Sequence, residues 1–194
     1  MSEQAATSAI TLERYEILEP IGEGKVGTLY RAFDKERKEE IALKVVYSKL
    51  VKERADWERF KREISSLAKL HHPSIVRLFG ADREGKHAFF TMELVEGTPL
   101  TDFVDKKKLP PRKVVEITAQ LAEALATAHE LDIIHRGVEL KNIVLTKEGV
   151  PKLLDFSLAK SIGEAPSAQV TKAGEMVGSL AYTPPEVLND GQHS

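Results

Sequence analysis

The sequence predicts an α+β fold, with a sheet-rich first half followed by a long helix, and its length suits either one domain or two small lobes. Five short segments carry the apolar pattern of strands: residues 15–21, 28–33, 41–46, 75–81 and 88–93. One helical stripe lies among them and predicts a helix over Asp56–Leu70. Thr98-Pro99 has the pattern of an N-cap followed by proline and predicts a short helix through Val104. After Pro110-Pro111 a second stripe predicts a long helix that ends near His129, and its apolar positions are Val114, Ile117, Leu121, Leu125 and Ala128. These patterns place one helix with the sheet and the longest helix after it.

Composition excludes several classes of partner. The chain has 194 residues, of which 42% are apolar and 30% charged, as in ordinary globular proteins. A net charge of −2 gives no reason to expect nucleic acid or a membrane as a partner. The absence of cysteine rules out disulfides and thiolate metal sites, and favours a cytoplasmic setting. Residues 1–13 lack the pattern of a signal peptide and are expected to form a disordered leader.

Three glycines join the first two predicted strands. Gly22, Gly24 and Gly27 have the spacing that lets backbone amides approach a polyphosphate without interference from Cβ atoms. A glycine-rich hairpin tip is also an ordinary turn, so the spacing alone leaves both interpretations open. The glycines lie between two strands and not before a helix, which argues against a dinucleotide-binding fold.

A lysine lies inside the third predicted strand. Lys44 is flanked by apolar residues, and an ammonium group in such a strand is costly to bury without a partner. One interpretation is an edge-strand lysine whose amine reaches water. The other is an ion pair with Glu63, which lies beside the apolar stripe of the next helix.

The stretch Ile134–Phe156 combines polar and apolar segments. Ile143–Leu145 and Lys152–Leu154 flank a Lys-Glu-Gly turn and predict a hairpin. Asn142 and Asp155 then lie at the ends of adjacent strands, where two oxygen ligands can share a hard cation such as Mg²⁺.

Residues 135–142 and 155–157 resemble the catalytic loop and metal-binding loop of the eukaryotic-type Ser/Thr protein kinase family. The family pattern is His-Arg-Asp-x-Lys-x-x-Asn, of which the chain keeps His135, Arg136 and Asn142. The resemblance implies a two-lobe kinase fold and Mg-ATP as cofactor.

The chain departs from the family at three positions. Gly137 stands where the family has its catalytic Asp, Glu139 where it has Lys, and Ser157 where Asp-Phe-Gly has its glycine. Loss of a general base typically costs ~10²–10⁴ in rate. The resemblance therefore implies a nucleotide site whose transfer chemistry is impaired.

Further site residues are implied by the resemblance alone. Lys44 would bind the α- and β-phosphates and pair with Glu63, Arg136 would pair with a phosphate on the activation segment, and Asn142 and Asp155 would hold the metal. The full set expected to contact nucleotide is Ile21, Gly22, Gly24, Gly27, Leu29, Ala42, Lys44, Met92, Glu93, Val95, Asn142, Val144 and Asp155. Candidate phosphorylation sites on the segment are Ser161, Ser167 and Thr171.

The resemblance also implies an organisation. It gives an N-terminal lobe over residues 14–93, a hinge at 94–97, and a partial C-terminal lobe with its activation segment over 98–194. Pro185-Glu186 matches the last two letters of the Ala-Pro-Glu that closes that segment. The later helices of the family's second lobe are not in the sequence, so we expect an incomplete lobe with an exposed apolar surface.

Three functions remain open from the sequence. The first is a pseudokinase-like module that binds Mg-ATP and acts on a regulatory protein partner. The second is a Ser/Thr kinase of low activity, in which Glu139 replaces the missing base and a protein is the substrate. The third is a truncated interaction module that needs another chain to complete its fold.

Overall fold

The computed structural model describes residues 10–24, 26–106, 109–156 and 182. The chain divides into two compact units. The first contains the residues up to 68 together with 78–94, and the second contains 69–77 and the residues from 95 onward. The predicted hinge at 94–97 lies where the first unit ends. Leu158, Pro185-Glu186 and the three candidate phosphorylation sites lie outside the described residues.

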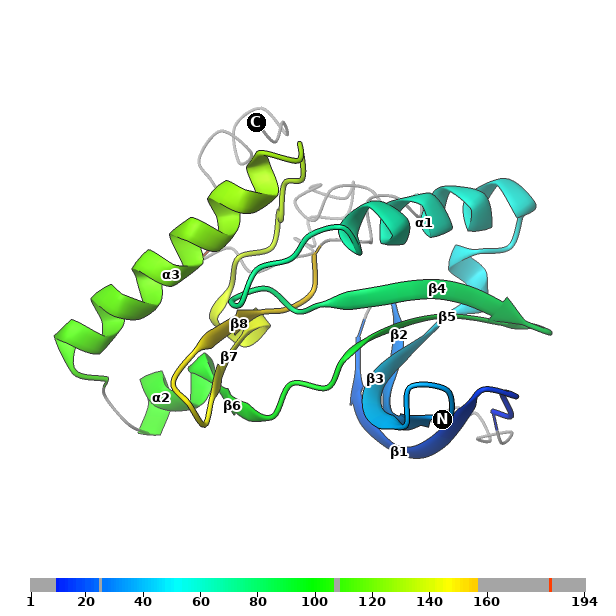
Figure 1. Cartoon of the computed structure of the whole chain (residues 1–194), viewed down its shortest axis with the longest axis horizontal. Helices are drawn as coiled ribbons and strands as arrows, with labels where there is room; N and C mark the ends of the chain where they lie inside the picture. The colour runs from blue at the N-terminus through cyan, green and yellow to red at the C-terminus, as the bar shows by residue number, and fades with distance from the viewer. Residues whose placement is uncertain (1–9, 25, 107–108, 157–181, 183–194) are drawn as a thin grey trace, which may run out of the picture. The chain divides into compact units, whose positions relative to one another are not determined.

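The first unit is a five-stranded antiparallel sheet with one long helix (Figure 1). Its elements are β1 (Tyr15–Glu23), β2 (Gly27–Asp34), β3 (Glu39–Val46), the 3₁₀ helix η1 (Ser48–Leu50), α1 (Arg54–Leu67), β4 (Leu78–Glu84) and β5 (His87–Glu93). The strand order is β1-β2-β3-β5-β4. The α+β prediction is confirmed, but the fourth strand begins at Leu78, three residues later than predicted, and runs on to Glu84.

Helix α1 forms where the apolar stripe predicts it. Its buried residues are Trp57, Phe60, Ile64 and Leu67. A capping box formed by Glu53 and Asp56 satisfies backbone amides at the first turn. The ring of Phe60 lies 5.8 Å from that of Phe90 on β5, edge to face, so the stripe packs on the sheet.

One core of the first unit lies on the sheet face that carries Ala32, Ile41, Leu43 and Phe89. Leu12 joins this core and is only 3% exposed. The residues just before β1, which the sequence analysis placed in the leader, are therefore packed. Residues 1–9 of that leader lie outside the described part.

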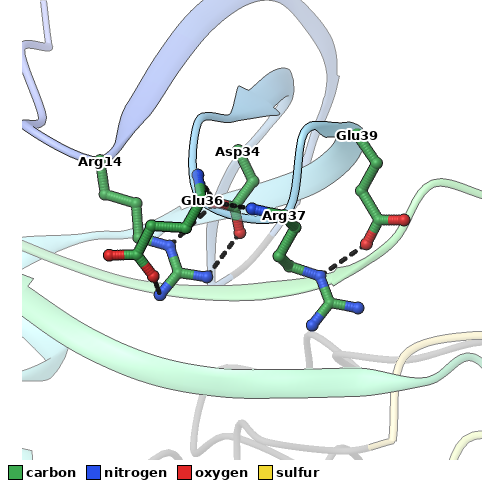
Figure 2. A network of polar contacts seen from close by, with 5 residues as sticks. All are labelled: Arg14, Asp34, Glu36, Arg37 and Glu39. Atoms are coloured by element: carbon green, nitrogen blue, oxygen red, sulfur yellow. Dashed lines mark hydrogen bonds and ion pairs between the residues drawn. The ribbon is translucent and has the colours of Figure 1, made fainter.

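A buried carboxylate fixes the turn between β2 and β3 (Figure 2). Asp34 is 1% exposed and accepts two hydrogen bonds from Arg14, at 2.9 and 2.7 Å. It also accepts hydrogen bonds from the backbone amides of Glu36 and Arg37. Burial by itself raises the pKa of Asp34, but the bonds from Arg14 and these two amides outweigh it, so the pKa is lowered overall.

The second unit combines helices with a three-stranded sheet of order β6-β7-β8. Its elements are β6 (Gly97–Pro99), α2 (Leu100–Lys106), α3 (Pro111–His129), the 3₁₀ helix η2 (Leu140–Asn142), β7 (Ile143–Thr146) and β8 (Pro151–Leu153). Its core contains Leu100, Ile117, Ile143, Leu145 and Leu153. No helix in the described part of the chain is long and apolar enough to span a membrane.

Residues 69–77 connect two elements of the first unit but pack in the second. The amide of Val76 donates to Leu153 O at 3.0 Å, and the amide of Leu153 donates to Ser74 O at 2.9 Å. Ile75 forms an isolated parallel bridge with Leu153. Residues 75–77, predicted as the start of the strand that pairs with β5, instead lie beside β8.

Two local predictions in the second unit are wrong. Thr98 and Pro99 do not cap a helix: they pair with Leu145 and Val144, and the helix begins at Leu100. On α3 the buried positions are Ile117, Ala124 and Ala128, with Leu121 and Leu125 partly buried, whereas the predicted stripe residue Val114 is 46% exposed.

Candidate functional site

The three glycines of the loop between β1 and β2 have different environments. A Cβ atom at Gly27 would overlap the carbonyl oxygen of Val45, so packing against β3 requires this glycine. At Gly22 and Gly24 a Cβ would meet nothing closer than 4.0 and 3.9 Å, and neither has a left-handed φ. The fold does not need these two glycines. Their bare backbone is what a phosphate-binding loop needs.

Lys44 lies next to this loop. Its side chain extends from β3 and is 8% exposed, and its Nζ lies 3.9 Å from the position of a Cβ on Gly24. The register places Lys44 opposite Leu29 and Phe90. A cation is thus held within the first unit, next to the exposed backbone of the glycine loop. Glu63 lies partly buried on α1, beside Ile64, and its pairing with Lys44 stays a prediction.

The other residues predicted to contact the nucleotide lie mostly on the sheet. Ala42 pairs with Met92 across β3 and β5, and both are buried. Ile21 lies on β1 and is exposed, and Glu93 is the last residue of β5. Val95 and Val144 belong to the second unit, where Val144 lies on β7.

His135 is the centre of the catalytic loop in the second unit. It is 1% exposed, and its ring lies 4.5 Å from that of Phe156. The Gly137 amide donates to Nδ1 at 3.2 Å, so the proton resides on Nε2, which donates to Leu154 O at 2.9 Å. Burial lowers the pKa of His135, against the opposing effects of Leu154 O and the Asp155 charge. A neutral imidazole therefore joins the loop to the segment after β8.

Asn142 and Asp155 lie at neighbouring strand ends, as predicted. Asn142 precedes β7 and its carbonyl accepts the amide of Leu154 at 2.7 Å, while its side-chain Nδ2 donates to Gly137 O at 2.8 Å. Asp155 has a φ of 51°, and Arg136 one of 59°. Each left-handed residue costs roughly 1 kcal/mol or more, which the surrounding hydrogen bonds must offset. Strain of this kind is typical of functional loops.

The ligand set is sparse for a metal site. Among the described residues, no group of three or more His, Cys, Asp or Glu side chains could hold a metal ion. Asn142 and Asp155 offer one amide and one carboxylate. Such a pair suits Mg²⁺, which is commonly bound through one or two carboxylates, substrate phosphates and water.

The position of the lost base has space but no carboxylate. A Cβ on Gly137 would lie 3.7 Å from Asn142 Nδ2 and 3.8 Å from His135 Nδ1, which are ordinary contact distances. Its φ lies outside the left-handed region, so an L-residue can adopt its backbone. The loop is therefore not rearranged around the glycine.

Glu139 forms an ion pair with Lys141, a residue that was not among the predicted site residues. Its side chain is 18% exposed, and one carboxylate oxygen lies 2.5 Å from Lys141 Nζ. The Glu-x-Lys spacing across the start of η2 was the available signal. This ion pair offsets the negative charge of Glu139, which stands where the family has Lys. It also occupies the carboxylate that the low-activity hypothesis requires as a base.

Comparison with known proteins defines the class. A family model described as "Protein kinase domain" matches residues 15–194. The Serine/threonine-protein kinase PknL of Mycobacterium tuberculosis is 32% identical over 185 residues, covering 95% of this chain and 46% of its own length. The Serine/threonine-protein kinase pkn2 of Myxococcus xanthus is 32% identical over 185 residues, 94% of this chain and 22% of its own.

Solved structures agree with this class. The M. tuberculosis PknI kinase domain matches with a TM-score of 0.68 at 28% identity, covering 84% of this chain and 66% of that one. The apo form of PpkA-294 matches with a TM-score of 0.74 at 26% identity, covering 91% and 69%. The chain belongs to the eukaryotic-type Ser/Thr protein kinase family. It spans less than half the length of these curated relatives.

Proposed function

We propose that this kinase-family chain binds Mg-ATP but transfers its γ-phosphate poorly, and that it acts through a protein partner. One observation carries the proposal: a Cβ at Gly137 would meet only ordinary contacts and the backbone there is one that an L-residue can adopt, yet the position carries no base. Phosphoryl transfer depends on positioning and charge neutralisation, so binding and transfer can be lost separately.

The first unit supplies groups that fit a polyphosphate. Packing does not require glycine at residues 22 and 24, so their missing side chains leave the backbone accessible. The Lys44 ammonium lies beside Gly24. In the second unit, Asn142 and Asp155 offer oxygens suited to Mg²⁺. Bound Mg-ATP supplies the γ-phosphate for transfer. The residues of this chain would hold its phosphates and its metal.

The groups that would handle the acceptor hydroxyl are altered. Without a side chain at residue 137, no carboxylate orients or deprotonates the hydroxyl at this position. A unit charge pair about 4 Å apart is worth roughly 4 kcal/mol at an effective dielectric of 20, so an unpaired Glu139 would oppose a phosphate nearby. Lys141 reduces that repulsion. The Glu139–Lys141 ion pair therefore favours a site that binds ATP but does not promote transfer of its phosphate.

Thermal melting tests the binding claim. Mg-ATP is expected to raise the melting temperature, because a ligand that binds only the native state stabilises it by mass action. Lys44→Ala is expected to abolish most of the shift, whereas Lys35→Ala on an exposed turn is expected to retain it. If the folded parent shows no shift, binding is refuted. An active parent that loses activity in Glu139→Gln would support the low-activity kinase instead.

A further inference from the structure

Tyr47 connects both sides of the glycine loop. It follows β3 and precedes η1, outside the loop itself. Its phenol donates to Glu23 Oε1 at 2.6 Å, and its backbone amide donates to Val26 O at 2.9 Å. Glu23 is the last residue of β1 and Val26 lies just before β2. One residue therefore binds the loop where it leaves one strand and where it enters the next.

Neighbouring contacts support this connection. The amide of Gly24 donates to Gly27 O at 3.0 Å and closes the loop. The bond to Glu23 raises the pKa of the Tyr47 phenol, so the phenol keeps its donor proton at neutral pH. Lys49 Nζ lies 5.5 Å from the centre of the Tyr47 ring, a cation–π contact on the same residue.

The hydroxyl contributes little to the core. Tyr47 is only partly buried, Glu23 is exposed, and neither belongs to the core of Leu12, Ala32 and Ile41. The bond restrains a turn in which Gly22, Glu23 and Gly24 are exposed. Glycine-rich backbone is conformationally free, so an external restraint determines where its amides point.

We propose that Tyr47 is a positioning residue, which holds the glycine loop beside Lys44 in the conformation that receives the phosphates of a nucleoside triphosphate. The inference rests on the proposed function, because it assigns the loop a phosphate ligand. It adds a residue outside the glycine loop to the groups that determine phosphate affinity.

Hydrogen exchange without nucleotide tests the restraint by itself. Tyr47→Phe and Glu23→Ala are each expected to speed exchange of the Gly24 amide. Glu23→Gln keeps an acceptor oxygen and is expected to stay near the parent. Tyr15→Phe, which removes a hydroxyl at the far end of β1, is the matched control. Unchanged exchange in both Tyr47→Phe and Glu23→Ala would overturn the proposal.

Titration with Mg-ATP and with adenosine tests the role in phosphate binding. Loss of one hydrogen bond is expected to weaken Mg-ATP binding by about 3- to 10-fold and to leave adenosine binding unchanged. The double variant Tyr47→Phe with Glu23→Ala is expected to be no weaker than either single variant. Equal weakening of both ligands would mean a general structural role and overturn the proposal.

The proposed function and the positioning role of Tyr47 can be refuted independently. A parent that binds neither ligand refutes the proposed function, and with it the phosphate role of Tyr47. The exchange measurement still shows whether Tyr47 holds the loop. A parent that binds Mg-ATP normally, with Tyr47→Phe indistinguishable from it, refutes only the positioning role.

Discussion

At residue 137, in the loop between His135 and Asn142, a glycine stands where the kinase family pattern has its catalytic Asp. Three hydrogen bonds hold this loop: His135 accepts the Gly137 amide, Asn142 Nδ2 donates to Gly137 O, and His135 Nε2 donates to Leu154 O. None of them needs a side chain at residue 137. The fold therefore tolerates the loss of the base, and restoring the base needs no change elsewhere in the loop.

Restoring both catalytic positions is expected to raise activity. Gly137→Asp with Glu139→Lys restores the carboxylate and the cation of the family pattern, and a Cβ at residue 137 would lie at ordinary contact distance, 3.7 Å, from Asn142 Nδ2. A recovered general base is expected to raise phosphate transfer by ~10² or more over the parent. Transfer of label from ATP to a generic Ser/Thr substrate measures it. Gly137→Asn with Glu139→Lys, which has the same size and no base, is the control. Equal activity in the two doubles would contradict the assignment.

At the scale of elements, the glycines of the β1–β2 hairpin differ in whether packing requires them. A Cβ at Gly27 would overlap the carbonyl oxygen of Val45, whereas a Cβ at Gly24 would lie at ordinary contact distance, 3.9 Å, from Lys44 Nζ. The same residue type at a regular spacing therefore serves two purposes. Only the register of β2 against β3, in which Gly27 pairs with Val46, shows which glycine serves which purpose.

Alanine substitution is expected to distinguish the two glycines. Gly27→Ala forces a clash with Val45 O and is expected to lower the melting temperature of the ligand-free chain sharply. Gly24→Ala is expected to leave that temperature within a few degrees of the parent, and to weaken the stabilisation by Mg-ATP. Melting curves with and without nucleotide measure both effects. The reverse pattern would refute the distinction.

The turn between β2 and β3 depends on one buried carboxylate. Asp34→Asn keeps the shape and removes the charge that Arg14 binds, and is expected to cost about 1–3 kcal/mol of unfolding free energy at pH 7. Glu36→Gln, at the exposed end of the same guanidinium, is expected to cost under about 0.5 kcal/mol. Urea unfolding measures both.

The pH dependence of this contribution has a defined sign. Because the folded-state pKa of Asp34 is lowered, its stabilisation is complete above the unfolded value of about 4 and is lost as the pH falls below that value. The difference between parent and Asp34→Asn is therefore expected to shrink between pH 5 and pH 3. A difference that grows with acidification would contradict the assignment.

Local sequence patterns predicted most elements but not the contacts between distant segments. The stripe of α1 and the hairpin of β7 and β8 follow from apolar periodicity and turn residues, which act over a few positions. Thr98-Pro99 carries a helix-start signal that strand pairing with β7 overrides. The bridge of Ile75 to Leu153 has no local signal, because it depends on residues far apart in the chain.

Prediction of the site was limited in the same way. The spacing of Gly22, Gly24 and Gly27 marked the loop, but not which glycine packing requires. Lys141 and Tyr47 were missed because their roles depend on a partner side chain, Glu139 in one case and Glu23 in the other. Neither residue belongs to the motif that identified the site.

At the scale of the whole molecule, the candidate site residues are divided between the two units. The first holds the glycine loop and Lys44, and the second holds His135, Asn142 and Asp155. The family is established by the match over residues 15–194, and the relatives carry kinase names. The proposed function rests on the pair of positions Gly137 and Glu139, where the chain departs from the family pattern. We therefore expect this chain to bind the nucleotide without efficient transfer of its phosphate.

One measurement tests that expectation most directly: transfer of label from γ-labelled Mg-ATP, at a nucleotide concentration where the thermal shift of the parent chain has saturated. The account predicts a saturable shift together with incorporation, into the chain itself and into a generic Ser/Thr substrate, no higher than that of Lys44→Ala. Incorporation by the parent clearly above Lys44→Ala, or no thermal shift in a folded parent, would contradict it.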